Sequence, residues 1–328
     1  MSKMENKRIL ITGGSGFIGT HYLLSSIKKG LEILNIDCVA PKRIDLIKYW
    51  KDCNILDFEK FSEIFRSFQP SIVLHFAANT NTNGKTLEDY SSNTIGTKNV
   101  LDTIKKTPSI SRVIITSSQH VRKPGTGLSS NIQEYFPHGL YGESKVITEK
   151  FTINSSLDCV WTIIRPTTIW GPYHNHLANG LWKIMKKGLY LHPKNDQVIR
   201  SYGYVKNLVW SIDRILEAQE ALINKKIYYL GDDLIKQSEW VDAFSLALIG
   251  RKTIKIPKFL IYLLSKFGDL VSNFSLDFPM NSSRYFNLTT TNPVPVRESI
   301  SLFGKPPVSL AVGIEETVTW LNSENILH

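Results

Sequence analysis

The chain has 328 residues, more than a single core of about 100 to 200 residues needs, which predicts one large α/β unit and a smaller second lobe. Its 42% apolar and 21% charged residues are typical of a folded globular protein and exclude a disordered chain. The net charge of +10 favours anionic partners such as nucleotide phosphates, but the 39 Lys and Arg residues form no basic block of the kind that binds nucleic acid.

The cysteines and the first residues indicate the compartment. Cys38, Cys53 and Cys159 show no CxxC spacing, which argues against a disulfide framework and against a metal site. The apolar residues 9–11 run straight into Thr12-Gly13-Gly14 instead of continuing as a signal-peptide core. We therefore expect a cytoplasmic protein without a bound metal.

Strand and helix patterns alternate through the first half of the chain. Strands are expected at 8–12, 31–37, 71–76, 112–116 and 160–164, and helices at 17–29, 57–68, 93–106 and 141–154. This order predicts βαβ units, and hence a Rossmann-type, doubly wound parallel sheet with helices on both faces.

Beyond Pro172 the alternation weakens and prolines divide the chain into shorter pieces. We expect the first domain to span 1–172, with part of 201–225 returning to it, and a smaller substrate-binding lobe to span 173–328. The apolar stripe of 258–274 suits either a membrane surface or the core, and the core is the preferred interpretation. Its longest apolar run is far shorter than the roughly 20 residues that span a bilayer, so no stable membrane insertion is expected.

The turn after the first strand carries a glycine pattern. Gly14-x-Gly16-x-x-Gly19 lies between a strand and a helix, where glycines allow a tight turn and a close approach of the backbone to a pyrophosphate. Asp37 ends the second strand, where its carboxylate suits an adenosine ribose and favours NAD, although Lys42 and Arg43 leave NADP open. The expected cofactor residues of this region are Gly13, Gly14, Gly16, Phe17, Ile18, Gly19 and Asp37.

A second pattern, Tyr141-Gly-Glu-Ser-Lys145, opens a predicted helix. A tyrosine and a lysine four residues apart share one helix face, so the ammonium is expected to lower the phenol pKa from about 10. Ser117 and Ser118 end a predicted strand upstream, and a hydroxyl there can hydrogen-bond the same substrate oxygen.

With these motifs the chain closely resembles the extended short-chain dehydrogenase/reductase family, in its NAD-dependent epimerase/dehydratase branch, over nearly its full length. The matching stretches are TGGSGFIG, HFAAN, NTIGTKNVL, ITSS, YGESK, IIRPTTIWGP and RSYGYVKNLV. The resemblance implies an enzyme that modifies a nucleotide sugar, as in polysaccharide biosynthesis, and a homodimer formed through a bundle that includes the helix at 141–154.

The resemblance also implies roles for single residues. Ser118 is the catalytic hydroxyl, Tyr141 the acid/base, and Lys145 holds the nicotinamide ribose. Arg200 resembles the arginine that grips the nucleotide diphosphate, with a surface ion pair as its other interpretation. Further cofactor contacts are implied at Asn54, Ile55, Ala77, Ala78, Asn93 and Pro166.

Departures from the family pattern bear on the reaction. Gln119-His120 stands where the dehydratases carry an acid pair, so dehydration is not expected. Thr168 replaces the expected substrate-contacting asparagine. His120 titrates in the range of a second acid/base group, and its other interpretation is a residue that lines or fills the sugar pocket. His75 is expected to be a buried structural histidine. The expected substrate residues are Ser118, Gln119, His120, Thr168 and Arg200.

Four functions remain after this reading. An NAD-dependent nucleotide-sugar 4-epimerase ranks first, because Asp37 favours NAD and the signature motifs are intact. A nucleotide 4-keto-sugar reductase, either with or without epimerisation through His120, ranks second. A steroid-type alcohol dehydrogenase and a non-catalytic dinucleotide sensor are disfavoured, the first by Arg200 and the second by the intact Ser118, Tyr141 and Lys145.

Overall fold

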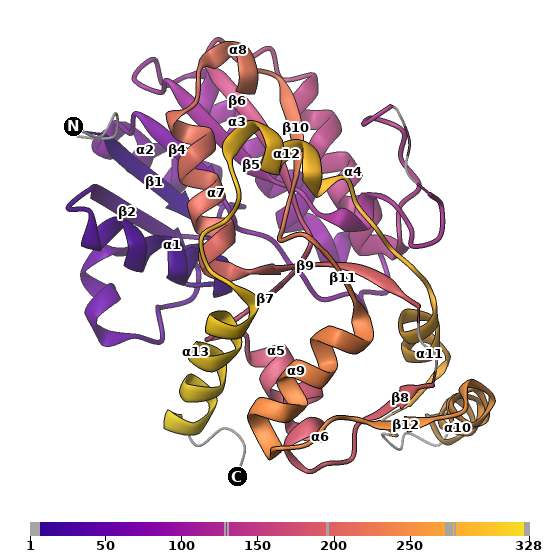
Figure 1. The fold of residues 1–328 in the computed structure, drawn as a ribbon. Coiled ribbons are helices and arrows are strands. Elements are labelled where there is room, and N and C mark those ends of the chain that lie inside the picture. The colour runs from indigo at the N-terminus through magenta and orange to yellow at the C-terminus, as the bar shows by residue number, and fades with distance from the viewer. Residues whose placement is uncertain are drawn as a thin grey trace. The chain divides into compact units, whose positions relative to one another are not determined.

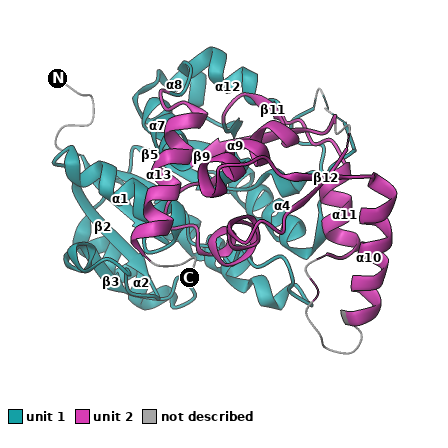
Figure 2. Ribbon diagram, turned by 60° about the horizontal axis from the view of Figure 1, so that its bottom comes forward, with its two compact units in different colours: residues 1–169, 205–231, 295–306 teal, residues 170–204, 232–294, 307–328 magenta. Residues whose placement is uncertain are grey.

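The computed structural model describes residues 7–127, 129, 131–194, 197–272, 278 and 280–324. The chain divides into two compact units (Figure 2). Unit 1 comprises residues 1–169, 205–231 and 295–306, and unit 2 comprises residues 170–204, 232–294 and 307–328. The chain therefore leaves unit 1 and returns to it twice.

Unit 1 is built on a seven-stranded parallel sheet with the strand order β10-β6-β5-β4-β1-β2-β3 (Figure 1). This is the predicted Rossmann-type sheet, and each of the five expected strands is confirmed, with no end shifted by more than two residues. The central strands are buried on both faces and are accordingly almost entirely apolar. Their bounds are β1 Arg8–Thr12, β2 Glu32–Asp37, β3 Trp50–Asp52, β4 Ile72–His75, β5 Arg112–Thr116, β6 Val160–Pro166 and β10 Lys226–Leu230.

Helices cover both faces of this sheet (Figure 1). Helices α1 and α7 pack together on one face, and α2, α3 and α4 form the layer on the other. Their bounds are α1 Phe17–Lys28, α2 Phe58–Phe68, α3 Thr97–Lys105, α4 Gly139–Ile153, α7 Val205–Glu217, α8 Glu220–Ile223 and α12 Val296–Phe303. Short 3-10 or π turns complete the unit at η1 Ile44–Tyr49, η2 Glu88–Tyr90, η3 Ser92–Gly96 and η4 Gln119–Val121.

The strand register places the expected site residues at one edge of the sheet. Thr12 pairs with Ile36 on one side and with His75 on the other, and Thr116 pairs with Ile164. Because the strands are parallel, the segments that follow them leave the sheet at the same edge. Ligands of doubly wound sheets bind at this carboxyl edge.

Unit 2 contains shorter elements around an aromatic core. Trp170, Trp182, Trp240 and Phe244 are buried together with ring centroids 4.6 to 5.9 Å apart along the chain of contacts. The strands β9 and β11 pair antiparallel, and β8 pairs with β12 in parallel. The bounds are β8 Leu191–Pro193, β9 Ile199–Tyr204, β11 Leu234–Lys236, β12 Ile254–Ile256, α5 Asn175–Leu177, η5 Ala178–Trp182, α6 Lys183–Lys186, α9 Gln237–Ile249, α10 Lys258–Ser272, α11 Ser282–Thr289 and α13 Leu310–Ser323; β7 Thr168–Trp170 carries the chain into this unit.

The expected lobe 173–328, with part of 201–225 returning to the first domain, differs from unit 2 at three places: unit 2 begins at residue 170, the returning segment is 205–231, and residues 295–306 also belong to unit 1. Helix α12, in residues 295–306, belongs to unit 1. Ser299 donates its hydroxyl hydrogen to the carbonyl of Tyr229 at 2.7 Å, and Phe303 packs edge-on against Tyr228 at 5.0 Å between ring centroids. These contacts with β10 are long-range in sequence, which explains why local patterns did not reveal them.

The core interpretation of 258–274 is wrong for the described residues 258–272. Helix α10 exposes large apolar side chains, among them Phe259, Leu263, Phe267 and Leu270. Periodicity predicts an apolar face but does not tell what covers that face. Within the described residues, no helix has the length and apolarity that crossing a bilayer requires.

Candidate active site

The turn between β1 and α1 is as tight as the glycine pattern predicts. Gly13 has φ +75°, and a Cβ there would lie 2.4 Å from the backbone nitrogen of Ala77. A Cβ on Gly19 would lie 2.4 Å from the carbonyl oxygen of Gly13. Gly16 precedes α1 and makes no side-chain cap hydrogen bond, and the positive end of the helix dipole at this turn favours an anion.

Asp37 stands beside this turn with its carboxylate already oriented. Its two carboxylate oxygens accept hydrogen bonds from the backbone N–H groups of Ser15 and Val39, each at 3.0 Å. Burial raises the pKa of this carboxyl group above its ordinary value, and the two hydrogen bonds oppose that shift. Arg43 forms an ion pair with Asp45 at 2.9 Å, so its guanidinium is engaged by a neighbouring carboxylate.

Hydrogen bonds and core packing hold two further segments that are expected to contact the cofactor. The side-chain oxygen of Asn54 accepts a hydrogen bond from the N–H of Leu56 at 3.0 Å, while Ile55 is buried in the core. Ala77 and Ala78 follow β4, and the N–H of Ala77 donates to the hydroxyl of Thr12 at 3.4 Å. Pro166 ends β6 and is buried.

The side chain of Asn93 stabilises the loop that follows β4. Its amide oxygen accepts from the N–H of Asn79 at 2.7 Å, and its amide nitrogen donates to the carbonyl of Asn79 and to the hydroxyl of Ser144, each at 2.9 Å. The residue is fully buried, so it supports the loop after β4 and ties that loop to α4.

His75 is the buried structural histidine that the sequence predicted. Its ring nitrogens lie 2.7 Å from the hydroxyl oxygen of Thr12 and 3.1 Å from that of Thr97. Burial, with a smaller contribution from Lys145, lowers the pKa of the imidazole to about 3, so it is neutral at physiological pH.

Ser118, Tyr141 and Lys145 meet at the carboxyl end of β5. The Ser118 side chain lies close enough to the Tyr141 phenol to lower its pKa, and the Lys145 ammonium donates to the carbonyl of Thr116 at 2.9 Å. All three residues are buried at or below 9% exposure. The structure therefore brings together the three residues predicted to perform catalysis.

The predicted lowering of the Tyr141 pKa is corrected. Burial raises the pKa of the phenol to about 12, with the hydrogen bond from Ser118 acting against that rise and Tyr90 adding to it. Burial also lowers the pKa of Lys145 to about 8, which Glu149 partly offsets. The spacing placed the two groups on one helix face, but it does not report the cost of burying the charged forms.

His120 lies against Tyr141, although its expected titration is corrected. The two rings meet edge to face at 5.5 Å, and His138 lies at the same distance on another side. Burial, followed by His138, lowers the pKa of His120 to about 4, so the imidazole is neutral near pH 7. Its Nδ1 finds no hydrogen-bond partner among the described residues.

The loop that carries His120 is pressed onto α4. A Cβ on Gly142 would lie 2.3 Å from the carbonyl oxygen of His120, and the same carbonyl accepts from the N–H of His138 at 2.8 Å. Among the expected substrate residues, Gln119 donates to the hydroxyl of Thr168 at 2.9 Å. Arg200 lies in unit 2, where its guanidinium donates to the carbonyl of Asn287.

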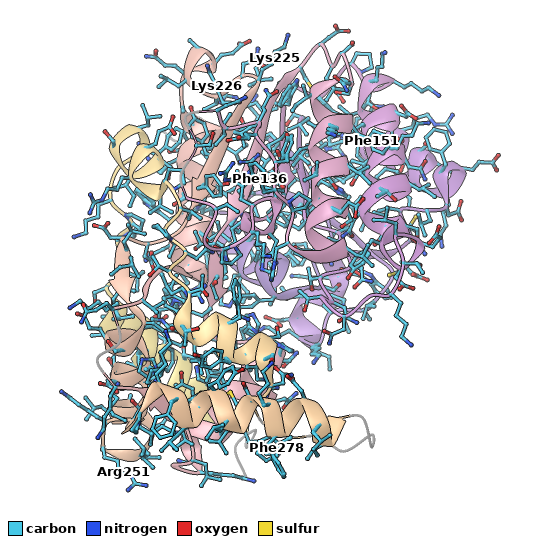
Figure 3. The ribbon with its side chains drawn as sticks, turned by 90° about the vertical axis from the view of Figure 1, so that its right-hand side faces the viewer. Phe136, Phe151, Lys225, Lys226, Arg251 and Phe278 are labelled. Carbon is cyan, nitrogen blue, oxygen red and sulfur yellow. The ribbon has the colours of Figure 1, made fainter. Side chains whose placement is uncertain are left out.

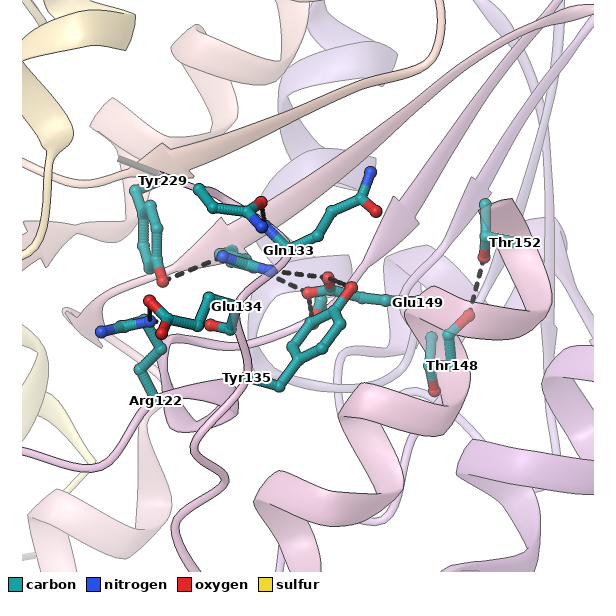
Figure 4. Close-up of polar contacts among 11 residues, drawn as sticks. Arg122, Gln133, Glu134, Tyr135, Thr148, Glu149, Thr152 and Tyr229 are labelled. Atoms are coloured by element: carbon teal, nitrogen blue, oxygen red, sulfur yellow. Dashed lines mark hydrogen bonds and ion pairs between the residues drawn. The ribbon is translucent and has the colours of Figure 1, made fainter. Parts of the chain in front are cut away.

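A buried ion pair behind the catalytic strand end was missed by the sequence reading (Figure 4). Both carboxylate oxygens of Glu149 accept hydrogen bonds at 2.7 Å from the guanidinium of Arg165, and both side chains are fully buried. Ser117 and Tyr135 also donate to Glu149, at 2.5 and 3.0 Å, while Arg165 donates to the hydroxyl of Tyr229 at 3.0 Å.

A signal for this pair was present in the sequence. Tyr141, Lys145 and Glu149 recur every four residues and so share one face of α4. Arg165 lies next to Pro166 in a strand that is otherwise apolar, where a charge needs a buried partner.

The shape of the turn fits a dinucleotide. The positive φ of Gly13, the space that a side chain at Gly19 would fill, the uncapped start of α1 and the preset carboxylate of Asp37 match a pyrophosphate followed by a ribose. Asp37 would hold the adenosine ribose, and Lys145 would hold the nicotinamide ribose.

Curated proteins with similar sequences have several activities. A sterol-4-alpha-carboxylate 3-dehydrogenase (decarboxylating) of Bos taurus is 25% identical over 240 residues, which cover 69% of this chain and 65% of the relative. A dTDP-D-glucose 4,6-dehydratase of Dictyostelium discoideum is 28% identical over 264 residues, or 69% of this chain and 58% of the relative. The matched regions thus span less than two thirds of these relatives.

Solved structures share the fold. A UDP-glucose 4-epimerase of Thermotoga maritima, determined with UDP-glucose, superposes with a TM-score of 0.75 at 18% identity and covers 97% of this chain and 99% of its own. The model of the family described as "NAD dependent epimerase/dehydratase family" matches residues 9–231, which include the glycine turn and the residues Ser118, Tyr141 and Lys145. The chain therefore belongs to the NAD dependent epimerase/dehydratase family.

Proposed function

We propose that the protein is an NAD-dependent nucleotide-sugar 4-epimerase. The observation that carries the proposal is the meeting of Ser118, Tyr141 and Lys145 in the same unit as an uncapped glycine turn and the oriented carboxylate of Asp37. Asp37 favours NAD over NADP, because a second negative charge on the ribose would face its carboxylate, and Arg43 is paired with Asp45.

Each catalytic side chain has a role at one oxygen atom of the sugar. Tyr141 accepts the proton of the hydroxyl group that is oxidised and later returns a proton to the same oxygen. Ser118 hydrogen-bonds this oxygen and steadies its partial charge. Lys145, one helical turn along from Tyr141, would hold the nicotinamide ribose next to the reacting oxygen. NAD, which Asp37 and Lys145 would hold, would supply the hydride acceptor and donor that this oxidation and re-reduction need.

Unit 2 is the proposed substrate-binding part, with Arg200 as the residue that contacts the diphosphate. The family resemblance and the basic character of Arg200 support this role. An Arg200→Met variant is expected to raise the KM for a nucleotide sugar and to leave NAD affinity unchanged. An unchanged KM would leave Arg200 as a residue that only ties β9 to the carbonyl of Asn287.

A 4-keto-sugar reductase is the second candidate, favoured by the neutral imidazole of His120 beside Tyr141. A neutral imidazole can take a proton from the carbon next to a ketone. This candidate predicts that solvent deuterium enters the product at that carbon and that His120→Asn abolishes the incorporation. The 4-epimerase predicts a product without solvent deuterium in both proteins.

We also propose a homodimer that forms through α3 and α4 in the cytoplasm. The two helices pack side by side, and Ile95 just before α3 and Phe151 on α4 (labelled in Figure 3) are exposed. Light scattering on the purified protein is expected to give twice the chain mass, and Phe151→Glu is expected to lower it. A monomeric wild-type protein would contradict this arrangement.

The cofactor that remains bound after purification tests the proposal. Denaturation followed by mass spectrometry is expected to release NAD in near-stoichiometric amount, because an epimerase regenerates its cofactor in place. A protein that is purified empty and binds NADPH on titration would favour the reductase instead.

A further inference from the structure

Helix α10 of unit 2 presents its apolar side outward. The exposed fractions are 62% for Phe259, 55% for Leu263, 52% for Phe267 and 58% for Leu270. At about 100° per residue, these four side chains and Leu260 fall within an arc of about 100° around the helix. Isolated exposed apolar residues are common on protein surfaces, whereas a continuous patch marks an interaction site.

The opposite side fixes α10 to unit 2. Ile261 and Ser265 are fully buried, and a Cβ on Gly268 would collide with the carbonyl oxygen of Met280. Asp269 accepts a hydrogen bond from the N–H of Ser282 at the start of α11, at 2.9 Å. Because the small and polar residues face inward, the outward direction of the apolar arc is built into the packing of the helix.

Among the described residues in and near α10, basic side chains outnumber acidic ones. Lys266 lies about 20° from Phe259 around the helix, at the border of the arc, and Lys258 starts the helix. Both lysines are exposed, as are Arg251 and Lys252 just before the helix. The acidic residue of α10, Asp269, is half-buried and bonded to Ser282, and it lies 3.9 Å from the ammonium of Lys266, which also donates to the Ser282 hydroxyl at 3.1 Å. Lys258 and Lys266 therefore outnumber the single acid of the helix, although Lys266 is partly compensated. An apolar arc bordered by cations is typical of a helix that lies in the interface of an anionic membrane.

A second copy of the chain fits this surface less well. A twofold interface brings the same patch against itself, so Lys258 and Lys266 of two copies would converge. Helix α11 adds another cation at Arg284 and no acid. At about 1.5 Å per residue, the fifteen residues of α10 are also too short to span a membrane, so the helix would lie along a surface.

We propose that α10 docks the protein onto the surface of an anionic lipid bilayer. Phe259, Leu263, Phe267 and Leu270 enter the boundary between headgroups and acyl chains, and Lys258 and Lys266 pair with lipid phosphates. Phe278, labelled in Figure 3, packs edge-on against Phe267 at 5.3 Å and continues the apolar surface. This function is separate from the catalytic residues of unit 1 and does not depend on the proposed epimerase activity.

The test is co-sedimentation of the full-length protein with phosphatidylcholine vesicles and with vesicles in which part of that lipid is replaced by phosphatidylglycerol. The wild-type protein is expected to sediment with the anionic vesicles, and added salt should weaken the binding. A Leu263→Ser/Phe267→Ser variant is expected to bind at least about tenfold more weakly, because its buried apolar area is smaller. A Lys258→Glu/Lys266→Glu variant is expected to lose the preference for anionic lipid.

Leu222→Ser is the matched control, because Leu222 is an exposed leucine on α8 of unit 1. It is expected to leave vesicle binding unchanged. A Leu263→Trp protein reports insertion directly, because brominated lipid is expected to quench its fluorescence more than that of the wild type. Absence of binding to either vesicle would overturn the proposal. A fall in the oligomeric state of the Leu263→Ser/Phe267→Ser variant would also overturn it, since it would identify a second copy as the occupant.

Discussion

At the scale of single residues, burial sets the pKa values of the groups that we propose as catalytic. Tyr141 has a raised pKa of about 12 and Lys145 a lowered pKa of about 8, and both shifts come first from burial. The phenol is therefore protonated at neutral pH in the ligand-free protein and must lose its proton before it can accept one from the sugar, whereas the ammonium is close enough to its pKa to respond to a bound ligand. The neighbouring Ser118 side chain opposes the rise in the pKa of Tyr141.

Replacing Tyr141 by Phe removes the proton carrier and keeps the ring in its pocket. Turnover is expected to fall by about 10² to 10⁴, the usual contribution of a positioned acid/base. NAD affinity, measured by titration, is expected to stay at the wild-type level. Retained turnover in this variant would remove Tyr141 from the mechanism.

Gly13 is a second position at which the backbone conformation and the lack of a Cβ atom are important. Gly13→Ala combines a positive φ with a Cβ placed 2.4 Å from the Ala77 nitrogen, so NAD binding is expected to be lost and the protein to unfold at a lower temperature. Gly30→Ala is the matched control, since Gly30 has φ +68° and open space around it. That control is expected to cost about 1 to 2 kcal/mol in unfolding free energy and to keep NAD binding. Equal NAD affinity in both variants would contradict the role of the turn.

At the scale of elements, the buried pair of Glu149 and Arg165 ties α4 to β6 just behind the catalytic strand end (Figure 4). A pair without solvent contact is costly to break, because the remaining charge has no water to stabilise it. The pair also interacts with the proposed catalytic site. Ser117, next to Ser118, donates a hydrogen bond to Glu149, and the charge of Glu149 raises the pKa of Lys145.

Glu149→Gln is therefore expected to lower the unfolding free energy by about 3 to 5 kcal/mol in urea denaturation. Glu217→Gln serves as the control, because its partner Arg214 is exposed, and it is expected to change that free energy by less than about 1 kcal/mol. If both variants lost the same unfolding free energy, the buried pair would contribute no more to stability than the exposed one, which would contradict the prediction. Adding Arg165→Met to Glu149→Gln is expected to restore part of the loss.

The sequence predicted those elements whose patterns are local. The strands Arg8–Thr12 and Arg112–Thr116 have the expected bounds, and the glycine turn, Asp37 and the residues Ser118, Tyr141 and Lys145 are brought to one edge of the sheet. Features that depend on partners far along the chain were not predicted, including the return of α12 to β10. The exposure of α10 belongs with these, because the amphipathic pattern is the same for a covered and an uncovered face.

At the scale of the whole molecule, buried histidines link stability to pH. The pKa values of His75 and His120 are lowered to about 3 and about 4, and burial lowers that of His174 to about 4. Between those values and the ordinary histidine value near 6.5, the unfolded chain binds protons that the folded protein does not. Their contribution to stability is therefore present at neutral pH and is lost as the pH falls below about 6.5.

The unfolding temperature is accordingly expected to fall between pH 7 and pH 5, with about 2 kcal/mol lost for each of His75 and His120 at pH 5. Differential scanning calorimetry measures this change. A His120→Asn variant is expected to show a shallower dependence, because it lacks one of the titrating groups. A wild-type unfolding temperature that rises on acidification would contradict this account.

The most direct test of the proposed 4-epimerase is the fate of a deuterium atom at carbon 4 of the sugar. UDP-glucose and dTDP-glucose that carry this label are incubated with the protein and NAD, and the products are followed by NMR. The proposal predicts an epimerised product that keeps the deuterium at carbon 4, with no accumulation of reduced cofactor and no turnover by the Tyr141→Phe variant. Accumulation of a keto-sugar with deuterated NADH, or no reaction with any nucleotide sugar alongside turnover of a sterol, would contradict it.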